Sequence, residues 1–337
     1  MIEIVIFFLV TLALTYVSNK INLLPNFSGE KHQLFINEKK VPLIGGILLL
    51  LISNYIFYDK NLFFCIGSLL VFIIGFLSDT KILISPKIRI LLQFLIVFFM
   101  SYILDIRVSS TRIEYLDKFI EVKFFGILFS VFCIMILLNG ANFIDGLNGL
   151  LLGYVIIVIL LLLKLNLLKG FDFNNEELFF LFISLMILLI FNYLNLFYLG
   201  DSGSYLSGII LGYILISVYN YNNYISPFFV ILLLWYPCFE NLFSIIRKNN
   251  FNKSPVIADN KHLHQLIFYF FKKKFFAKNI ISNNFSSLLI NLYNLIIMFI
   301  AASNISSSKF QILLISINIV VYLIIYKILF NFRFIKK

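Results

Sequence analysis

The chain has little of what a water-soluble protein needs. Only 13% of its 337 residues are charged, against roughly 25% in soluble domains. Hydrophobic residues make up 61%, and the mean hydropathy is +0.99. Acids are scarcest, with 16 Asp and Glu against 27 Lys and Arg. This composition excludes a soluble enzyme, and no soluble domain of useful size remains outside the apolar runs.

Cysteines and linkers are also scarce. The three cysteines, Cys65, Cys133 and Cys238, all lie inside apolar runs, which argues against a disulfide framework. No Gly/Ser-rich or Pro-rich linker and no internal repeat divides the chain, so we expect a single domain over 1–337. The net charge of +11 does not indicate nucleic acid, because the basic residues lie in short loops between apolar runs.

Eleven apolar runs are long enough to suggest membrane crossing, which takes about 20 residues for a ~30 Å hydrocarbon core. They cover 2–18, 42–57, 62–78, 88–104, 124–141, 150–168, 178–197, 203–219, 226–246, 285–302 and 309–329. The prediction is an all-α, polytopic membrane helix bundle of about 11 transmembrane helices, with ten or twelve as alternatives. An outside N-terminus puts 19 of the 27 basic residues on the inner side, which predicts a cytoplasmic C-terminus.

Five polar clusters follow the first, third, fifth, seventh and ninth runs. They occupy the loops 19–41, 79–87, 142–149, 198–202 and 247–284. Alternating spans put all five on the cytoplasmic face, where we expect them to form one active site. Each also has a plainer interpretation: Asp145, Asp201 or Ser202 as a helix cap, Asp79 as part of a turn, and the histidine pair as loop polarity or half of a zinc site.

Such a site suits phosphoryl transfer. Carboxylates and amides hold Mg²⁺ together with water and substrate phosphates. Lysine, arginine and helix N-termini hold phosphates. Positioning and charge neutralisation do most of the catalysis in that chemistry. The location predicts one substrate in the lipid and one in the cytosol.

Five motifs in this order resemble the polyprenyl-phosphate N-acetylhexosamine-1-phosphate transferases, or glycosyltransferase family 4. They are VPLIGG (41–46), GFLSD (75–79), NGANFIDGLNGL (139–150), YLGDSGS (198–204) and KHLHQL (261–266). The span count and the histidine motif resemble the GlcNAc-1-phosphate branch more than the phospho-MurNAc-pentapeptide transferases.

The resemblance implies a reaction and its setting. GlcNAc-1-phosphate, or a related N-acetylhexosamine-1-phosphate, passes from a UDP-sugar to undecaprenyl phosphate, and UMP leaves. The expected cofactor is Mg²⁺, with Mn²⁺ as an alternative. The expected location is the inner cell membrane, as the first membrane step of an O-antigen, capsule, teichoic acid or similar pathway. A homodimer stays open.

The resemblance also assigns roles by position. Asp79, Asp145 and Asp201 are the expected catalytic residues. Asp201, Asn142 and Asp145 are the expected metal ligands. The expected substrate-binding residues are Lys39, Lys40, Asn142, Asn192, Lys261, His262 and His264. Among these, the histidines face the nucleotide-sugar, Lys261 lies near its phosphates, and Lys39 or Lys40 holds the lipid phosphate.

Three positions depart from the family pattern. Ser78 stands where the family has the first of two adjacent Asp, Asn148 replaces a frequent Asp, and Gln265 replaces a frequent His. A phosphate monoester with a second pKa near 6 is mostly dianionic at pH 7, so a direct displacement tolerates the loss of a base at position 78.

Two alternatives to an active transferase of the GlcNAc branch come from other classes. The first is a transporter or flippase for lipid-linked sugars, whose sites lie near mid-membrane. Glu240 is the one acid in the runs that fits this alternative. The second is a catalytically inactive relative, because of Ser78. A phospho-MurNAc-pentapeptide transferase remains the alternative within the family.

Overall fold

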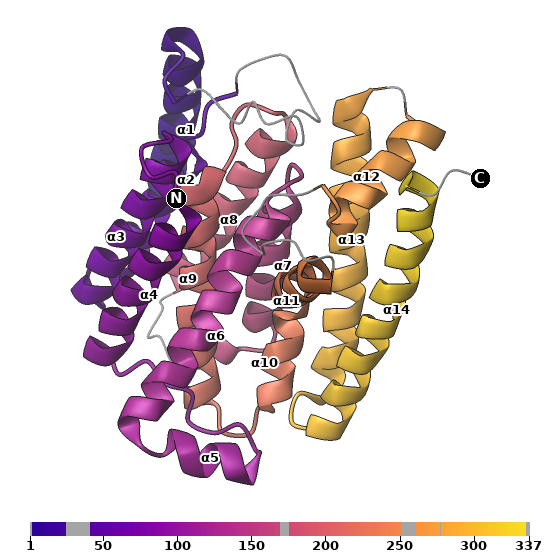
Figure 1. Cartoon of the computed structure of the whole chain (residues 1–337). Coiled ribbons are helices and arrows are strands. Elements are labelled where there is room, and N and C mark those ends of the chain that lie inside the picture. The colour runs from indigo at the N-terminus through magenta and orange to yellow at the C-terminus, as the bar shows by residue number, and fades with distance from the viewer. Residues whose placement is uncertain (1, 25–40, 169–174, 251–259, 277, 335–337) are drawn as a thin grey trace.

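The computed structural model describes residues 2–24, 41–168, 175–250, 260–276 and 278–334. These residues form helices and no strand (Figure 1). The α-helices are α1 (Ile2–Ile21), α2 (Gly45–Phe57), α3 (Leu62–Asp79), α4 (Pro86–Ile103), α5 (Glu114–Ile120), α6 (Lys123–Ile144), α7 (Leu150–Lys164), α8 (Asn175–Tyr193), α9 (Gly200–Tyr221), α10 (Pro227–Leu233), α11 (Trp235–Asn250), α12 (Leu263–Lys274), α13 (Asn279–Ala301) and α14 (Ser308–Phe334).

Within these described ranges, seven helices are long and apolar enough to cross a membrane, or eight if the bent pair α10–α11 is one span. The remaining expected runs form the shorter apolar helices α2, α7 and the Phe179–Tyr193 part of α8. The prediction of an all-helical, multi-pass membrane protein is confirmed. The count of eleven spans and the sides of the two termini remain predictions.

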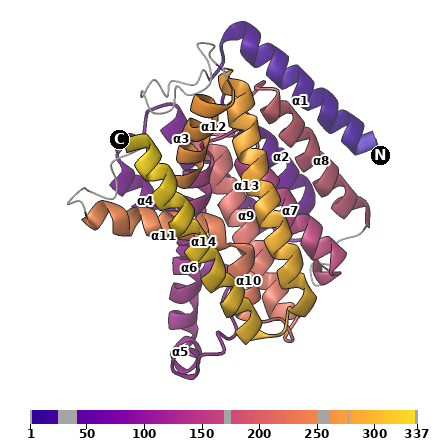
Figure 2. The same cartoon turned by 90° about the vertical axis from the view of Figure 1, so that its right-hand side faces the viewer.

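Helix α9 forms the centre of the bundle. Of its most apolar 18-residue window, 83% is buried, against 22% for α1 and for α14. It packs on α2, α3 and α6, whereas α1 and α14 lie at the periphery (Figures 1 and 2). The polar start of α9 is therefore enclosed by neighbouring helices.

The expected span 226–246 is broken. Helices α10 and α11 meet at an angle of 76°, and α11 runs across the bundle in Figure 2. Pro237 explains the break, because a proline ring clashes with the carbonyl four residues earlier, and α10 ends at that residue, Leu233. The freed Leu233 carbonyl accepts a hydrogen bond from Tyr154 at 2.8 Å.

Two expected loops are shorter than predicted. Helix α6 continues to Ile144, so Asn142 is helical and the 142–149 segment begins inside a helix. Helix α9 begins at Gly200, so Asp201 and Ser202 lie in its first turn rather than in a loop over 198–202. Both helices extend beyond their apolar runs into polar sequence, and neighbouring helices bury part of that sequence, including Ser202.

One end of the bundle is held by Arg112, beside α5. Its guanidinium donates hydrogen bonds to the carbonyls of Ile225 (2.9 Å) and Ser306 (2.8 Å). These contacts join the loops before α5, before α10 and before α14. The polar clusters therefore belong to the other helix ends.

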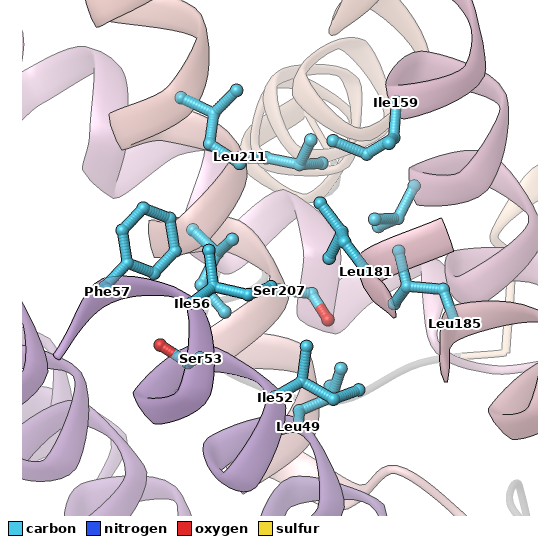
Figure 3. A pocket seen from close by; sticks show the side chains of 13 residues that line it. Leu49, Ile52, Ser53, Ile56, Phe57, Ile159, Leu181, Leu185, Ser207 and Leu211 are labelled. Carbon is cyan, nitrogen blue, oxygen red and sulfur yellow. The ribbon is translucent and has the colours of Figure 1, made fainter. Parts of the chain in front are cut away.

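A small cavity of about 30 Å³ lies between α2, α7, α8 and α9 (Figure 3). Its wall is apolar apart from the hydroxyls of Ser53 and Ser207. That volume is about one water molecule, which is too small for a sugar or a nucleotide. The candidate site must lie among the polar helix ends.

Candidate active site

The start of α9 is capped by a carboxylate from another helix. Asp79, the last residue of α3, accepts hydrogen bonds from the backbone N–H of Asp201 (2.7 Å) and Ser202 (3.1 Å). It also accepts one from the Ser202 hydroxyl at 2.7 Å. The interpretation of Asp201 or Ser202 as the cap is therefore wrong, since Asp79 satisfies these donors.

Gly75 allows α3 to approach this closely. A Cβ at Gly75 would lie 2.3 Å from the Cα and 2.5 Å from the backbone nitrogen of Ser202. Any side chain there would push α3 away from α9. The GFLSD and YLGDSGS motifs thus form one unit: the glycine lets α3 come close to α9, and Asp79 then caps the start of α9.

The Asp201 carboxylate does not cap the helix and accepts hydrogen bonds from three side chains. One oxygen accepts from the Asn142 amide of α6 at 2.7 Å. The other accepts from Arg89 of α4 at 2.7 Å and from the Ser78 hydroxyl. Asn142 also donates to Ser204 at 3.0 Å. Side chains of α3, α4, α6 and α9 therefore meet at Asp201.

Asp145 lies next to this group without touching it. Its carboxylate is half-buried and has no hydrogen-bond partner in the described part of the chain. Burial raises the pKa of Asp145 well above its ordinary value, and the negative charges of Asp201 and Asp79 raise it further. An unpaired carboxyl group of this kind is a candidate for proton chemistry or ligand contact.

The segment after Asp145 is held by amide side chains. Gly149, with a φ of 72°, donates its backbone N–H to Asn192 of α8 at 2.6 Å. The Gly149 carbonyl accepts from Asn291 of α13 at 3.0 Å, and Asn148 N–H donates to Asn283 at 2.8 Å. Helices α8 and α13 thus fix the turn that carries Asp145.

His264 is completely buried against this turn. A Cβ on Gly146 would lie 2.4 Å from its Nε2. Neither ring nitrogen has a hydrogen-bond partner among the described residues, and the side chain is 0% exposed. Burial lowers the pKa of His264 to about 3, with a smaller contribution from nearby His262. The ring is therefore neutral at pH 7 and carries unsatisfied polar atoms beside Asp145.

His262 is held by Glu240, the acid that fitted the transport alternative. Its Nδ1 is 2.9 Å from Glu240 of α11, whose other oxygen accepts from the Tyr322 hydroxyl of α14 at 2.8 Å. The ring stacks between Phe143 and His264, with centroid distances of 5.3 and 5.6 Å. The contact between Nδ1 and Glu240 fixes the orientation of the ring.

The structure brings Asp79, Asn142 and Asp201 into one group, with Asp145, His262 and His264 beside it. The Asn192 side chain accepts a hydrogen bond from the Gly149 N–H and donates one to the Phe197 carbonyl (2.9 Å), so it holds the backbone in place. The Lys261 ammonium lies over the rings of Phe330 and Phe334 of α14. Lys39 and Lys40 lie outside the described residues. The substrate roles of all these residues remain predictions.

Sequence reasoning missed several residues of this group. Arg89 was visible only as a cation one turn before Gln93 on α4, and nothing in the spacing pairs it with Asp201. Glu240 suggested a transport site, whereas it orients a histidine. Asn283 and Asn291 had no signal, because amides inside an apolar helix give no sequence motif.

The sequence is similar to known proteins of one family. Residues 61–219 match the sequence profile of glycosyl transferase family 4. A protein of Bacillus subtilis (strain 168), named a probable undecaprenyl-phosphate N-acetylglucosaminyl 1-phosphate transferase, is 25% identical over 251 residues, which are 70% of this chain and 68% of that protein. The undecaprenyl-phosphate alpha-N-acetylglucosaminyl 1-phosphate transferase of Escherichia coli (strain K12) is 27% identical over 283 residues, covering 78% and 74%.

A third relative represents another branch. The phospho-N-acetylmuramoyl-pentapeptide-transferase of Petrotoga mobilis is 31% identical over 198 residues, which are 52% of this chain and 60% of that protein. Fold and site define a multi-pass membrane transferase with its polar residues gathered at one end of the bundle. Residues 61–219, just under half of the chain, match glycosyl transferase family 4, and the resemblance seen in the motifs is confirmed by this match and by the relatives.

Proposed function

We propose that the protein transfers an N-acetylhexosamine 1-phosphate, preferably GlcNAc 1-phosphate, from a UDP-sugar to undecaprenyl phosphate. The names of the relatives support this acceptor and this sugar. The observation that carries the proposal is the meeting of Asp79, Asn142 and Asp201 at one end of a membrane bundle. A lipid-borne phosphate and a water-soluble nucleotide can both reach helix ends at a membrane surface.

The proposed reaction is a direct displacement. An oxygen of the lipid phosphate forms a bond to the sugar-linked phosphorus, and the bond from that phosphorus to the UMP oxygen breaks. UMP leaves with the electron pair. The attacking phosphate is mostly dianionic at pH 7, so no protein base has to remove a proton. The protein's part is to hold two anions together and to stabilise their charge.

A divalent cation fits this site with few protein ligands. Asp201 offers one carboxylate and Asn142 an amide oxygen, and Mg²⁺ takes one or two carboxylates together with waters and substrate phosphates. Bound there, Mg²⁺ would neutralise charge on the phosphates. The described residues contain no group of three or more His, Cys, Asp and Glu that could hold a metal, so a cation here would take most of its ligands from water and substrate phosphates. A ligand role for Asp145 stays a prediction.

The proposed topology has eleven spans, an outside N-terminus and a cytoplasmic C-terminus, in the inner cell membrane. With the bent pair α10–α11 counted as one span, eight long spans and three shorter apolar helices match the eleven expected runs. Of these short helices, α2 and α7 contact the central helix α9, and α8 packs on α7 and α1. This orientation turns the site toward cytosolic UDP-sugars.

A transfer assay tests the proposal. Purified protein receives undecaprenyl phosphate and radiolabelled UDP-GlcNAc, with Mg²⁺ or with a chelator, and both UMP and labelled lipid are measured. We expect both products only with the cation, and none from Asp201→Asn. The matched control is Asp105→Asn, which changes a carboxylate that is 46% exposed and paired only with Arg107 and Lys123. Normal turnover by Asp201→Asn would refute the assignment.

A panel of donors identifies the sugar. UDP-GlcNAc, UDP-GalNAc and UDP-MurNAc-pentapeptide are compared under the same conditions. The expected order puts UDP-GlcNAc first. Exclusive use of the pentapeptide donor would place the protein with the Petrotoga relative instead.

A further inference from the structure

Arg89 occupies the carboxylate that the proposed cation needs. Its Nη1 lies 2.7 Å from an oxygen of Asp201 and also donates to the Ser78 hydroxyl. The two charged side chains are 21% and 28% exposed, so water screens them only in part. The Arg89 Nε is buried without a hydrogen-bond partner. Asp201 is the carboxylate that holds this guanidinium in place.

With serine at position 78, Asp201 is the one acid paired with Arg89 in the described part of the chain. The neighbouring Asp79 uses both carboxylate oxygens on the first turn of α9. The Ser78 hydroxyl reaches both Arg89 and Asp201, but it carries no charge. A carboxylate at position 78 would start from the same Cβ and could take the guanidinium in place of Asp201.

We propose that Arg89 and a divalent cation compete for Asp201, and that the serine at position 78 sets this competition in favour of Arg89. The inference rests on the proposed function, because it concerns the cation of that site. A guanidinium binds phosphate oxygens with fork geometry. An arriving diphosphate therefore draws Arg89 away from Asp201 and frees the carboxylate. Cation and nucleotide then bind cooperatively, each raising the affinity for the other.

Manganese binding measures this competition without turnover. The free Mn²⁺ signal in electron paramagnetic resonance is followed on purified protein, with and without UDP. In Arg89→Gln we expect Mn²⁺ to bind about tenfold more tightly than in the wild type, because a positive charge next to the carboxylate is gone. Ser78→Asp is expected to tighten binding by a similar factor, since it gives Arg89 another partner.

The effect of UDP separates competition from simple charge. UDP should tighten Mn²⁺ binding several-fold more in the wild type than in Arg89→Gln, where no guanidinium has to move. Lys87→Gln, which removes an exposed cation from the same helix, is the matched control and should bind Mn²⁺ as the wild type does. If Arg89→Gln does not fold, Ser78→Asp alone carries the test.

Each outcome decides the question. Wild-type or weaker Mn²⁺ affinity in both Arg89→Gln and Ser78→Asp, or no binding by any variant, overturns the proposal. Equal tightening in Lys87→Gln also overturns it, since general charge then suffices. A protein that shows the competition but transfers no sugar contradicts the proposed function and leaves this inference standing.

Discussion

Substitution of Asp79 tests whether this carboxylate supports the architecture or acts in the chemistry. It accepts three hydrogen bonds, two from backbone N–H groups and one from Ser202, at 2.7 to 3.1 Å. A hydrogen bond contributes about 1 kcal/mol to stability on average, and more when its acceptor is charged. Partial exposure lowers that figure, while a negative charge at a helix N-terminus adds about 0.3–1 kcal/mol. Asp79→Ala should therefore lose about 3–4 kcal/mol.

The matched variant is Asp79→Asn, which keeps one oxygen acceptor and loses the charge. We expect about half the loss, near 2 kcal/mol. Thermal unfolding of the detergent-solubilised protein without substrates measures both variants. At roughly 2 °C per kcal/mol for a large chain, the Tm should fall by about 4 °C for Asn and about 7 °C for Ala.

A second measurement separates the two roles. Transfer activity should fall in the same order as the Tm, because Asp201 loses its place when the first turn of α9 loosens. Asp105→Asn should change neither quantity. An Asp79→Ala protein with the wild-type Tm and no transfer activity would refute the capping argument and assign Asp79 to the chemistry.

Three further predictions concern neighbouring groups. Glu240→Gln removes the charge facing His262 and should lower the transfer rate roughly tenfold. Tyr322→Phe should lower it less. Unchanged turnover in Glu240→Gln would contradict the orienting role of this acid. The pKa of His264 is about 3 in the folded protein, against an ordinary 6.5. Between pH 3 and pH 6.5, therefore, only the unfolded chain binds a proton at this histidine. Stability should therefore fall as the pH drops below 6.5, by up to about 2 kcal/mol at pH 5, and His264→Gln should flatten the denaturation profile; equal slopes would disprove it. Ser78→Ala leaves Asp201 paired with Arg89 and Asn142, so a transfer assay should show at most a few-fold change; complete loss would contradict this.

The sequence predicted much of this site because polar residues are rare in an apolar chain. The position of Asp79 at the end of one run and of Asp201 at the start of another placed them at the same membrane surface. Their contact follows from alternation of spans and from the close approach at Gly75. What alternation cannot predict is which carboxylate oxygen meets which donor, so the capping role of Asp79 required coordinates.

Other features depend on side-chain packing that no periodicity reports. Glu240 looked like an acid at depth in a straight span, which fitted the transport alternative. The break before Trp235 turns α11 across the bundle and brings Glu240 to His262 of another segment. Pro237 was visible in the sequence, but a proline predicts only that a helix bends or ends, and the direction comes from the packing of α11 on α6.

The geometry also explains why serine at position 78 is compatible with a transferase. Asp79 holds α9, so the residue at 78 is the one that faces Asp201 and Arg89. A base at 78 would have to take a proton that the lipid phosphate has already lost at pH 7. What the position must supply is contact with Asp201, and a hydroxyl supplies it. Because position 78 carries no charge, Arg89 pairs with Asp201 instead. The serine therefore lowers the affinity for the cation and leaves the chemical step unchanged.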